Sequence, residues 1–300
     1  MMETKFSDLP EDVQHKIVDA MSIQDVGIWG TISTSERQRI RGRMKRVLAL
    51  TQPPFNMDKN ELCQITDFDL NCKCVGDAGL TTLAAACANG ALAQVTELYL
   101  GGNFIGNDGL TALADACANG ALAQVTKLDL RANKFGDAGL TALAAACANG
   151  ALAKVTHLSL YENKICDAGL TALADACAKG ALAKVTNLYL DGNQIGDDGL
   201  SALATACASG ALANLQNLYL HKNDVGDAGL SALADACANG ALANVKLLNL
   251  SRNAIGDAGL SALANASAKG ALASLETLHV DNEEHPALKA VCQARDIDLR

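Results

Sequence analysis

The sequence has few aromatic residues and little proline: Phe, Trp and Tyr make up 3% of 300 residues, and there are 4 prolines and one tryptophan. It also has no run that approaches the eighteen apolar residues of a membrane span, and its first residues, MMETKFSDLPED, lack the apolar core of a secretory signal. We therefore predict a soluble cytoplasmic protein, with a nuclear location as the alternative and no membrane partner.

Positive charge is scarce beyond the N-terminal region. The chain contains 24 basic and 33 acidic residues, for a net charge of −9, and 8 of the basic residues fall within the first 50 positions. Because a nucleic-acid interface needs a basic stripe that neutralises phosphates, the acidic remainder argues against a nucleic-acid partner.

Catalytic motifs are lacking as well. The sequence has no phosphate-binding P-loop, no Gly-x-Ser-x-Gly nucleophile elbow and no histidine pair at the helical spacing of a metal site. We therefore expect a non-enzymatic protein with no cofactor and no metal centre.

Cysteine is plentiful, with 11 residues, but its spacing does not indicate a disulfide framework. Six cysteines recur every thirty residues on a predicted helix stripe: Cys87, Cys117, Cys147, Cys177, Cys207 and Cys237. Packed helices lie about 8–10 Å apart, whereas a disulfide needs Cα atoms within about 7 Å, so neighbours in this column should remain small buried thiols. Cys63, Cys72 and Cys74 form a separate cluster, for which we find no fourth metal ligand.

What the sequence does contain is a unit of thirty residues, clearest at 95–124, VTELYLGGNFIGNDGLTALADACANGALAQ. Seven copies occupy 65–274, the first of them degenerate. Self-similarity at a fixed period predicts a solenoid, in which each unit packs on the next.

Each unit reads as one strand followed by one helix. The alternation Leu98-Tyr99-Leu100 predicts a short strand with one buried face, and Asn103 predicts a buried side chain that bonds turn backbone, repeated as a ladder. The Asp or Asn at the position of Asn107 suits a helix N-cap, and Gly120 suits a left-handed helix end.

The pattern LxxLxLxxN-x-(I/V/F)-G-(D/N)-x-G-L resembles the leucine-rich repeat of the ribonuclease-inhibitor type over roughly residues 61–299. No copy carries the Ile-Pro motif of the extracellular plant type. The resemblance implies an α/β fold: a curved solenoid with parallel inner strands and outer helices. Residues 275–300 are expected to form a C-terminal cap, with a helix that starts at His285-Pro286 and a final short strand at Ile297 and Leu299. His285 itself is expected in a solvated loop.

Residues 7–50 differ from the repeats and predict a small helical module, separated from them by a linker at 51–64 with Pro53 and Pro54. The residues Leu9-Pro10-Glu11-Asp12-Val13, followed by Asp25-Val26 and Ile32-Ser33, resemble an F-box. That resemblance implies docking to the adaptor subunit of a cullin–RING ubiquitin ligase through Leu9, Pro10, Ile17, Val26 and Ile32. The alternative is a helical cap over the open end of the solenoid.

Function in such a solenoid is expected on the concave strand face, at positions that the fold does not constrain. The candidate partner-binding residues are Tyr99, Lys127, Asp129, Arg131, His157, Tyr161, Glu162, Tyr189, Asp191, Tyr219, His221, Lys222 and Arg252. Aromatic and mixed charged residues on one face favour protein binding. The alternative explanation is that tyrosine is common in strands whether or not they bind a partner.

Three hypotheses follow. The first is an F-box substrate receptor of a ubiquitin ligase that binds its target on the concave face, and the second is a free-standing scaffold or inhibitor, monomeric by itself. The third is a GTPase activator of the Ran type, which would use Arg131 to stabilise phosphoryl transfer.

Overall fold

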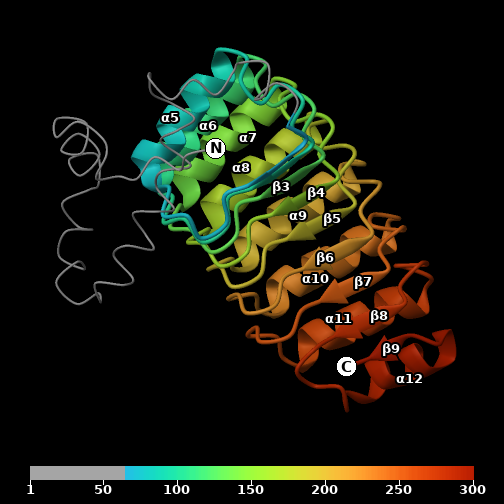
Figure 1. The fold of residues 1–300 in the computed structure, drawn as a ribbon. Helices are drawn as coiled ribbons and strands as arrows, with labels where there is room; N and C mark the ends of the chain where they lie inside the picture. Colours follow the sequence, from blue (N-terminus) through green and yellow to red (C-terminus); the bar gives the residue numbers. More distant parts are fainter. Residues whose placement is uncertain (1–64) are drawn as a thin grey trace, which may run out of the picture.

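The computed structural model describes residues 65–300, so the expected helical module at 7–50 and linker at 51–64 lie outside the described residues. Within that range, strands and helices alternate along the whole chain (Figure 1). The strands are β1 (Asp67–Asp69), β2 (Glu97–Tyr99), β3 (Lys127–Asp129), β4 (His157–Ser159), β5 (Asn187–Tyr189), β6 (Asn217–Tyr219), β7 (Leu247–Asn249), β8 (Thr277–His279) and β9 (Asp298–Leu299). The helices are α5 (Gly76–Ala88), α6 (Asn107–Ala118), α7 (Asp137–Ala148), α8 (Asp167–Ala178), α9 (Asp197–Ala208), α10 (Asp227–Ala238), α11 (Asp257–Ala268) and α12 (Pro286–Arg295).

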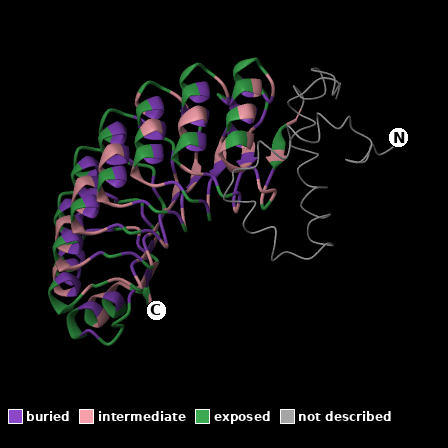
Figure 2. Cartoon of the chain, turned by 90° about the vertical axis from the view of Figure 1, so that its left-hand side faces the viewer, coloured by how far each residue is buried: buried purple, intermediate pink, exposed green. Residues whose placement is uncertain are grey.

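The nine described strands form one parallel sheet in sequence order, and from β1 to β8 they pair with a register of thirty residues, so that Leu98 lies opposite Leu128 and Leu128 opposite Leu158. The helices follow the outer side of an arc and the strands its inner side (Figure 2). This confirms the predicted solenoid. No helix in the described range is long and apolar enough to span a membrane.

The core lies between the sheet and the helices. The middle leucine of each strand from β2 to β8 and the predicted helix stripe are buried; in the 95–124 copy the stripe consists of Leu110, Leu113, Ala114 and Cys117. These residues form one continuous core that links every repeat to the next. Burying one leucine side chain contributes about 1.5–3 kcal/mol to its stability. The six column cysteines are all buried free thiols, as expected.

The asparagine ladder is present as predicted. Asn133 Nδ2 donates to the carbonyls of Leu100 and Leu130, at 3.0 and 2.9 Å, and its Oδ1 accepts from the backbone N–H groups of Asn103 and Ile105. One buried side chain thereby satisfies backbone groups of two repeats that neither a strand nor a helix satisfies.

The predicted N-cap role of the Asp/Asn column is wrong for the residue's own helix. The cap position is the preceding residue, for example Gly226, and no side chain caps α10 from within its own repeat. Instead, Asp197 Oδ1 accepts from the N–H groups of Gly226 and Gly229, at 2.7 and 2.8 Å. Asp77, Asp167 and Asp227 likewise cap the helix of the following repeat, because stacking brings the carboxylate to that helix's unpaired N–H groups.

The helix ends agree with the prediction. Gly120 has φ +91°, its N–H donates to Cys117 O, and Ala121 N–H donates to Ala116 O at 3.0 Å. This is the Schellman arrangement, in which a left-handed glycine turns the chain and satisfies the last carbonyls.

The C-terminal segment contains α12 and β9, as predicted, with Leu288 and Cys292 buried. His285, which we expected in a solvated loop, is instead buried with 6% exposure. Its Nδ1 accepts from Leu288 N–H at 3.3 Å, and its Nε2 lies 3.2 Å from Ser261 Oγ. The imidazole therefore caps α12 and ties it to the last repeat helix.

Candidate functional site

The concave face consists of four positions in each copy. Two are the first and third residues of the strand, and two are the residues that follow the leucine directly after the strand. In β2 to β8 the middle residue is buried while the first and third are mostly half-buried, because successive side chains of a strand point to opposite faces. The third residue of β3, Asp129, is an exception, being buried. All strands are parallel and in register, so equivalent residues of consecutive copies stand side by side in columns.

At the N-terminal part of this face, Tyr99 forms one cluster with two charged residues. Its hydroxyl hydrogen-bonds the Glu97 carboxylate, and Lys127 Nζ lies 4.9 Å from the ring centroid and 3.9 Å from Glu97 Oε2. The bond to Glu97 raises the pKa of Tyr99, and the bond to Tyr99 raises the pKa of Lys127. The three side chains therefore satisfy one another before any ligand arrives.

Arg131 is the centre of the next cluster. Its Nε lies 3.3 Å from Asp129 Oδ2, and its guanidinium lies over the Tyr161 ring at 5.9 Å from the centroid. The Asp129 side chain is only 8% exposed, so it acts by holding Arg131 and offers little surface of its own.

Tyr189 and Tyr219 stack on each other in the middle of the face. Their ring centroids are 4.7 Å apart with an interplanar angle of 16°. Burial raises the pKa of Tyr219, with further contributions from Tyr189 and Asp191. Together the two rings form an aromatic surface that spans β5 and β6.

Asp191 and His221 form a hydrogen-bonded contact beside this tyrosine pair. Asp191 Oδ1 lies 2.8 Å from His221 Nδ1, and the exposed fractions of the two side chains are 7% and 36%. Burial raises the pKa of Asp191, and the facing His221 opposes that rise. His221 is therefore the accessible member of the pair.

The remaining candidates lie at the rim or elsewhere on the face. Glu162, Lys222 and Arg252 are exposed and have φ of +53°, +57° and +55°, immediately past the strand ends. His157 is half-buried on β4, where burial and, secondly, Lys127 lower its pKa. The adaptor-binding candidates Leu9, Pro10, Ile17, Val26 and Ile32 lie outside the described residues.

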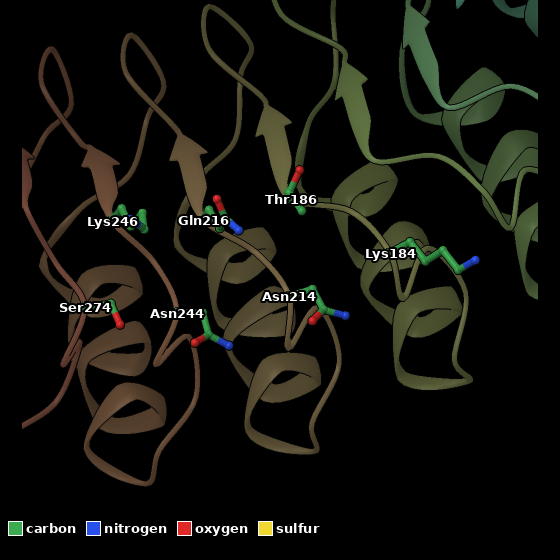
Figure 3. Close-up of a pocket in the computed structure, with 7 residues that line it drawn as sticks. All are labelled: Lys184, Thr186, Asn214, Gln216, Asn244, Lys246 and Ser274. Carbon is green, nitrogen blue, oxygen red and sulfur yellow. The ribbon is translucent and has the colours of Figure 1, made fainter. Parts of the chain in front are cut away.

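One hollow was not predicted. A shallow polar groove of about 420 Å³ follows the loops that lead into β5, β6 and β7, and Figure 3 shows its lining: Lys184, Thr186, Asn214, Gln216, Asn244, Lys246 and Ser274. In earlier copies a threonine hydroxyl at this position bonds the preceding copy, as Thr186 bonds Thr156 O at 3.2 Å. The replacement of threonine by Gln216 and Lys246 was the sequence signal for this groove.

Across residues 65–300, no group of three His, Cys, Asp or Glu side chains is placed to hold a metal ion. The concave face offers rings, amides and charged groups that are already oriented, which suits binding.

Comparison with known families supports this architecture. The leucine-rich repeat family matches five segments: 94–114, 124–144, 181–204, 211–234 and 241–264. Each of these five segments is similar to a leucine-rich repeat. β4 and α8 lie outside the matched segments, yet they have the same form as the strands and helices of the matched copies.

Among solved structures, 86 chains match. One is an internalin from Listeria monocytogenes, at 22% identity and a TM-score of 0.40, over 66% of this chain and 49% of that one. Another is a plant ice-binding protein, at 18% identity and a TM-score of 0.31, over 58% of this chain and 60% of that one. The chain thus matches about half to three fifths of these proteins, and no curated protein matches its sequence.

Proposed function

We propose that this protein is a non-enzymatic scaffold that binds a protein partner on its concave face. The strongest support is the difference between columns in how much the residue changes from copy to copy. The helix position of Ala114 is alanine in all seven copies, whereas the column of Gly101 contains Gly, Arg, Tyr, Asp, His and Ser in turn. Variation of this kind on an accessible face is what a solenoid needs to recognise one partner.

The contacts on that face support the proposal further. Tyr99, Arg131 and His221 are each held by a neighbouring side chain, so little side-chain entropy is lost when a partner docks. Tyrosine and arginine are also the residue types that contribute most to binding energy at protein interfaces.

Selection of ligands tests the proposal without knowledge of the natural partner. A phage library of random sixteen-residue peptides is selected on the intact chain, and affinities are measured by calorimetry. We expect the double variant Lys127→Asn/Tyr161→Ser, which uses residues found elsewhere in the same columns, to weaken most selected ligands. The matched outer-face variant Asp175→Ala/Asp235→Ala should not. Ligands that are insensitive to the first variant and sensitive to the second would refute the concave site.

The finer proposal is that residues 7–50 act as an F-box and make the protein a substrate receptor of a cullin–RING ubiquitin ligase. It rests on the sequence resemblance through Leu9, Pro10, Ile17, Val26 and Ile32. Co-expression of the full chain with the ligase adaptor subunit should give a complex that Leu9→Ala/Pro10→Ala abolishes. Absence of a complex would favour the free-standing scaffold with a helical cap.

No observation on the concave face favours the Ran-type GTPase activator. Arg131 would have to extend toward a bound nucleotide, but it is engaged by Asp129 and lies over Tyr161. Stimulation of a GTPase by the intact chain, abolished in Arg131→Ala, would restore this hypothesis.

A further inference from the structure

The exposed aromatic rings in the described part of the chain follow a pattern. Lys127 covers Tyr99, Arg131 covers Tyr161, and Lys134 Nζ lies 4.6 Å from the ring centroid of Phe104. A cation over a ring face is attracted by the ring's quadrupole. Within residues 65–300, no such contact is formed by Tyr189 or Tyr219, which instead cover one face of each other.

The two outer faces of this tyrosine pair are open for a geometric reason. The centroid separation of 4.7 Å equals the spacing of neighbouring strands, so each ring stands above its own strand and faces along the solenoid axis. The next residues in the same column are Ser159, opposite Tyr189, and Asn249, opposite Tyr219. Both are short, and the Asn249 side chain is drawn toward Ser251 Oγ at 2.8 Å.

Each outer face therefore borders a slot about one strand spacing wide, which suits one planar group. A guanidinium is planar and cationic, so it continues the stack in the way that Arg131 already covers Tyr161. An ammonium group lacks the planar shape, and the excess of 33 acidic over 24 basic residues favours a cationic partner over a neutral ring.

The distance between the slots sets the spacing of the ligand's side chains. Along this column, Ser159 and Asn249 are three strand spacings apart, or about 14 Å. Four residues of extended peptide span about 13 Å, which is nearly the same distance. Residues four apart in an extended chain also point to the same side.

We propose that the partner presents an extended segment with two arginines four residues apart, Arg-x-x-x-Arg, which clasps the Tyr189–Tyr219 stack from both sides. The segment crosses β4 to β7 along the solenoid axis, with one guanidinium over Ser159 and the other over Asn249. This inference rests on the proposed function of the concave face and specifies the partner that the face takes.

The test uses the full chain and the peptide acetyl-Gly-Arg-Ser-Gly-Ser-Arg-Gly-amide, with calorimetry and the ring NMR signals of the two tyrosines as readouts. We expect Tyr189→Ser and Tyr219→Asn each to weaken binding about 2- to 30-fold, the range of one cation–ring contact. These variants use the residues present at Ser159 and Asn249. The control Asp175→Ala, at an exposed position of the outer helix α8, should change the affinity less than about 2-fold.

Three further peptides distinguish the alternatives. Replacing both arginines by lysine, or placing them side by side, should weaken binding by a similar factor, and replacing them by phenylalanine should abolish it. Equal affinity for the lysine peptide, or stronger binding of the phenylalanine peptide, overturns the inference. If library-selected peptides bind the concave face while the arginine peptide does not, the inference fails and the proposed function stands. If no peptide binds the concave face, both fail.

Discussion

Asp227 Oδ1 accepts hydrogen bonds from the backbone N–H groups of Gly256 and Gly259, at 2.7 and 2.9 Å, although these glycines belong to the next repeat. A carboxylate from one copy thus satisfies the helix start of the copy that follows. The same contact recurs from Asp77, which caps α6 through Gly106 and Gly109. Because the cap crosses the boundary between repeats, it contributes to the interface that couples neighbouring units in a solenoid.

Removing one of these caps should therefore lower global stability. Asp227→Ala is expected to reduce the free energy of unfolding by about 1–2 kcal/mol, because two N–H groups lose a charged acceptor. Asp257 provides the matched control, since it occupies the same position in α11 but its carboxylate is within reach only of Asn282 Nδ2, at 3.4 Å. Urea unfolding of both variants checks this. A decrease for Asp257→Ala as large as for Asp227→Ala would contradict the account.

The glycine at the third position of α6 and of α8 to α11 is explained by the Asp carboxylate of the preceding repeat. A Cβ added at Gly199 would lie 2.6 Å from Asp167 Oδ1 and 3.0 Å from Asp167 Cα. Glycine to alanine within a helix normally stabilises by about 0.5–1 kcal/mol, but here we expect Gly199→Ala to destabilise by about 1–3 kcal/mol. Thermal unfolding measures the sign. Thr205→Ala, at an exposed site of the same helix, should be neutral or stabilising.

The asparagine ladder makes a second paired prediction. Asn133→Ala leaves buried backbone groups of two repeats unsatisfied and should cost about 3 kcal/mol or more. Asn163 forms the bonds from Nδ2, but its buried Oδ1 has no protein partner. Asn163→Ala should therefore cost about 1–2 kcal/mol less. Equal decreases in denaturant unfolding would show that the Oδ1 bonds contribute nothing.

The cysteine column predicts a decline in stability at alkaline pH. Burial raises the pKa of the Cys117 thiol to about 12, and the pKa values of the other column thiols shift in the same direction. An unfolded thiol ionises near its ordinary pKa of 9.0, while the folded thiol keeps its proton, so stability is complete below pH 9 and falls as pH rises toward 12. Over that pH range, each such thiol lowers the free energy of unfolding by at most about 1.4 kcal/mol per pH unit.

A variant with the six column cysteines changed to alanine isolates this effect from the titration of lysine and tyrosine. Its unfolding free energy, measured from about pH 8 to about pH 11, should fall less steeply than that of the natural chain. Identical slopes would mean that these thiols ionise equally in both states. A small residue other than cysteine already occupies this column position in α11, where Ser267 is buried.

The sequence was sufficient to predict the solenoid because the thirty-residue period imposes one local structure on every copy. Asn103 and Gly120 were assigned correctly, since Asn103 Nδ2 donates to Leu100 O of its own copy and Gly120 turns the chain at the end of its own helix. Asp227 was misassigned because its partner Gly256 is 29 residues away and depends on how helices stack. The thirty-residue period predicts that Tyr189 and Tyr219 occupy equivalent positions, but it does not predict the orientations of their rings. The stack was therefore visible only in the structure. His285 was misjudged because its burial depends on α12 folding back onto α11.

The most direct test of the central claim is the affinity of library-selected peptides for two full-length variants. The concave variant combines Lys127→Asn, Tyr161→Ser, Tyr189→Ser and Tyr219→Asn, and the outer-face variant combines Asp175→Ala and Asp235→Ala. Calorimetry should show affinity reduced by at least about 100-fold for the concave variant and unchanged for the outer-face variant, given about 1–2 kcal/mol for each aromatic ring that is removed. Unchanged affinity in a folded concave variant would show that the partner binds elsewhere.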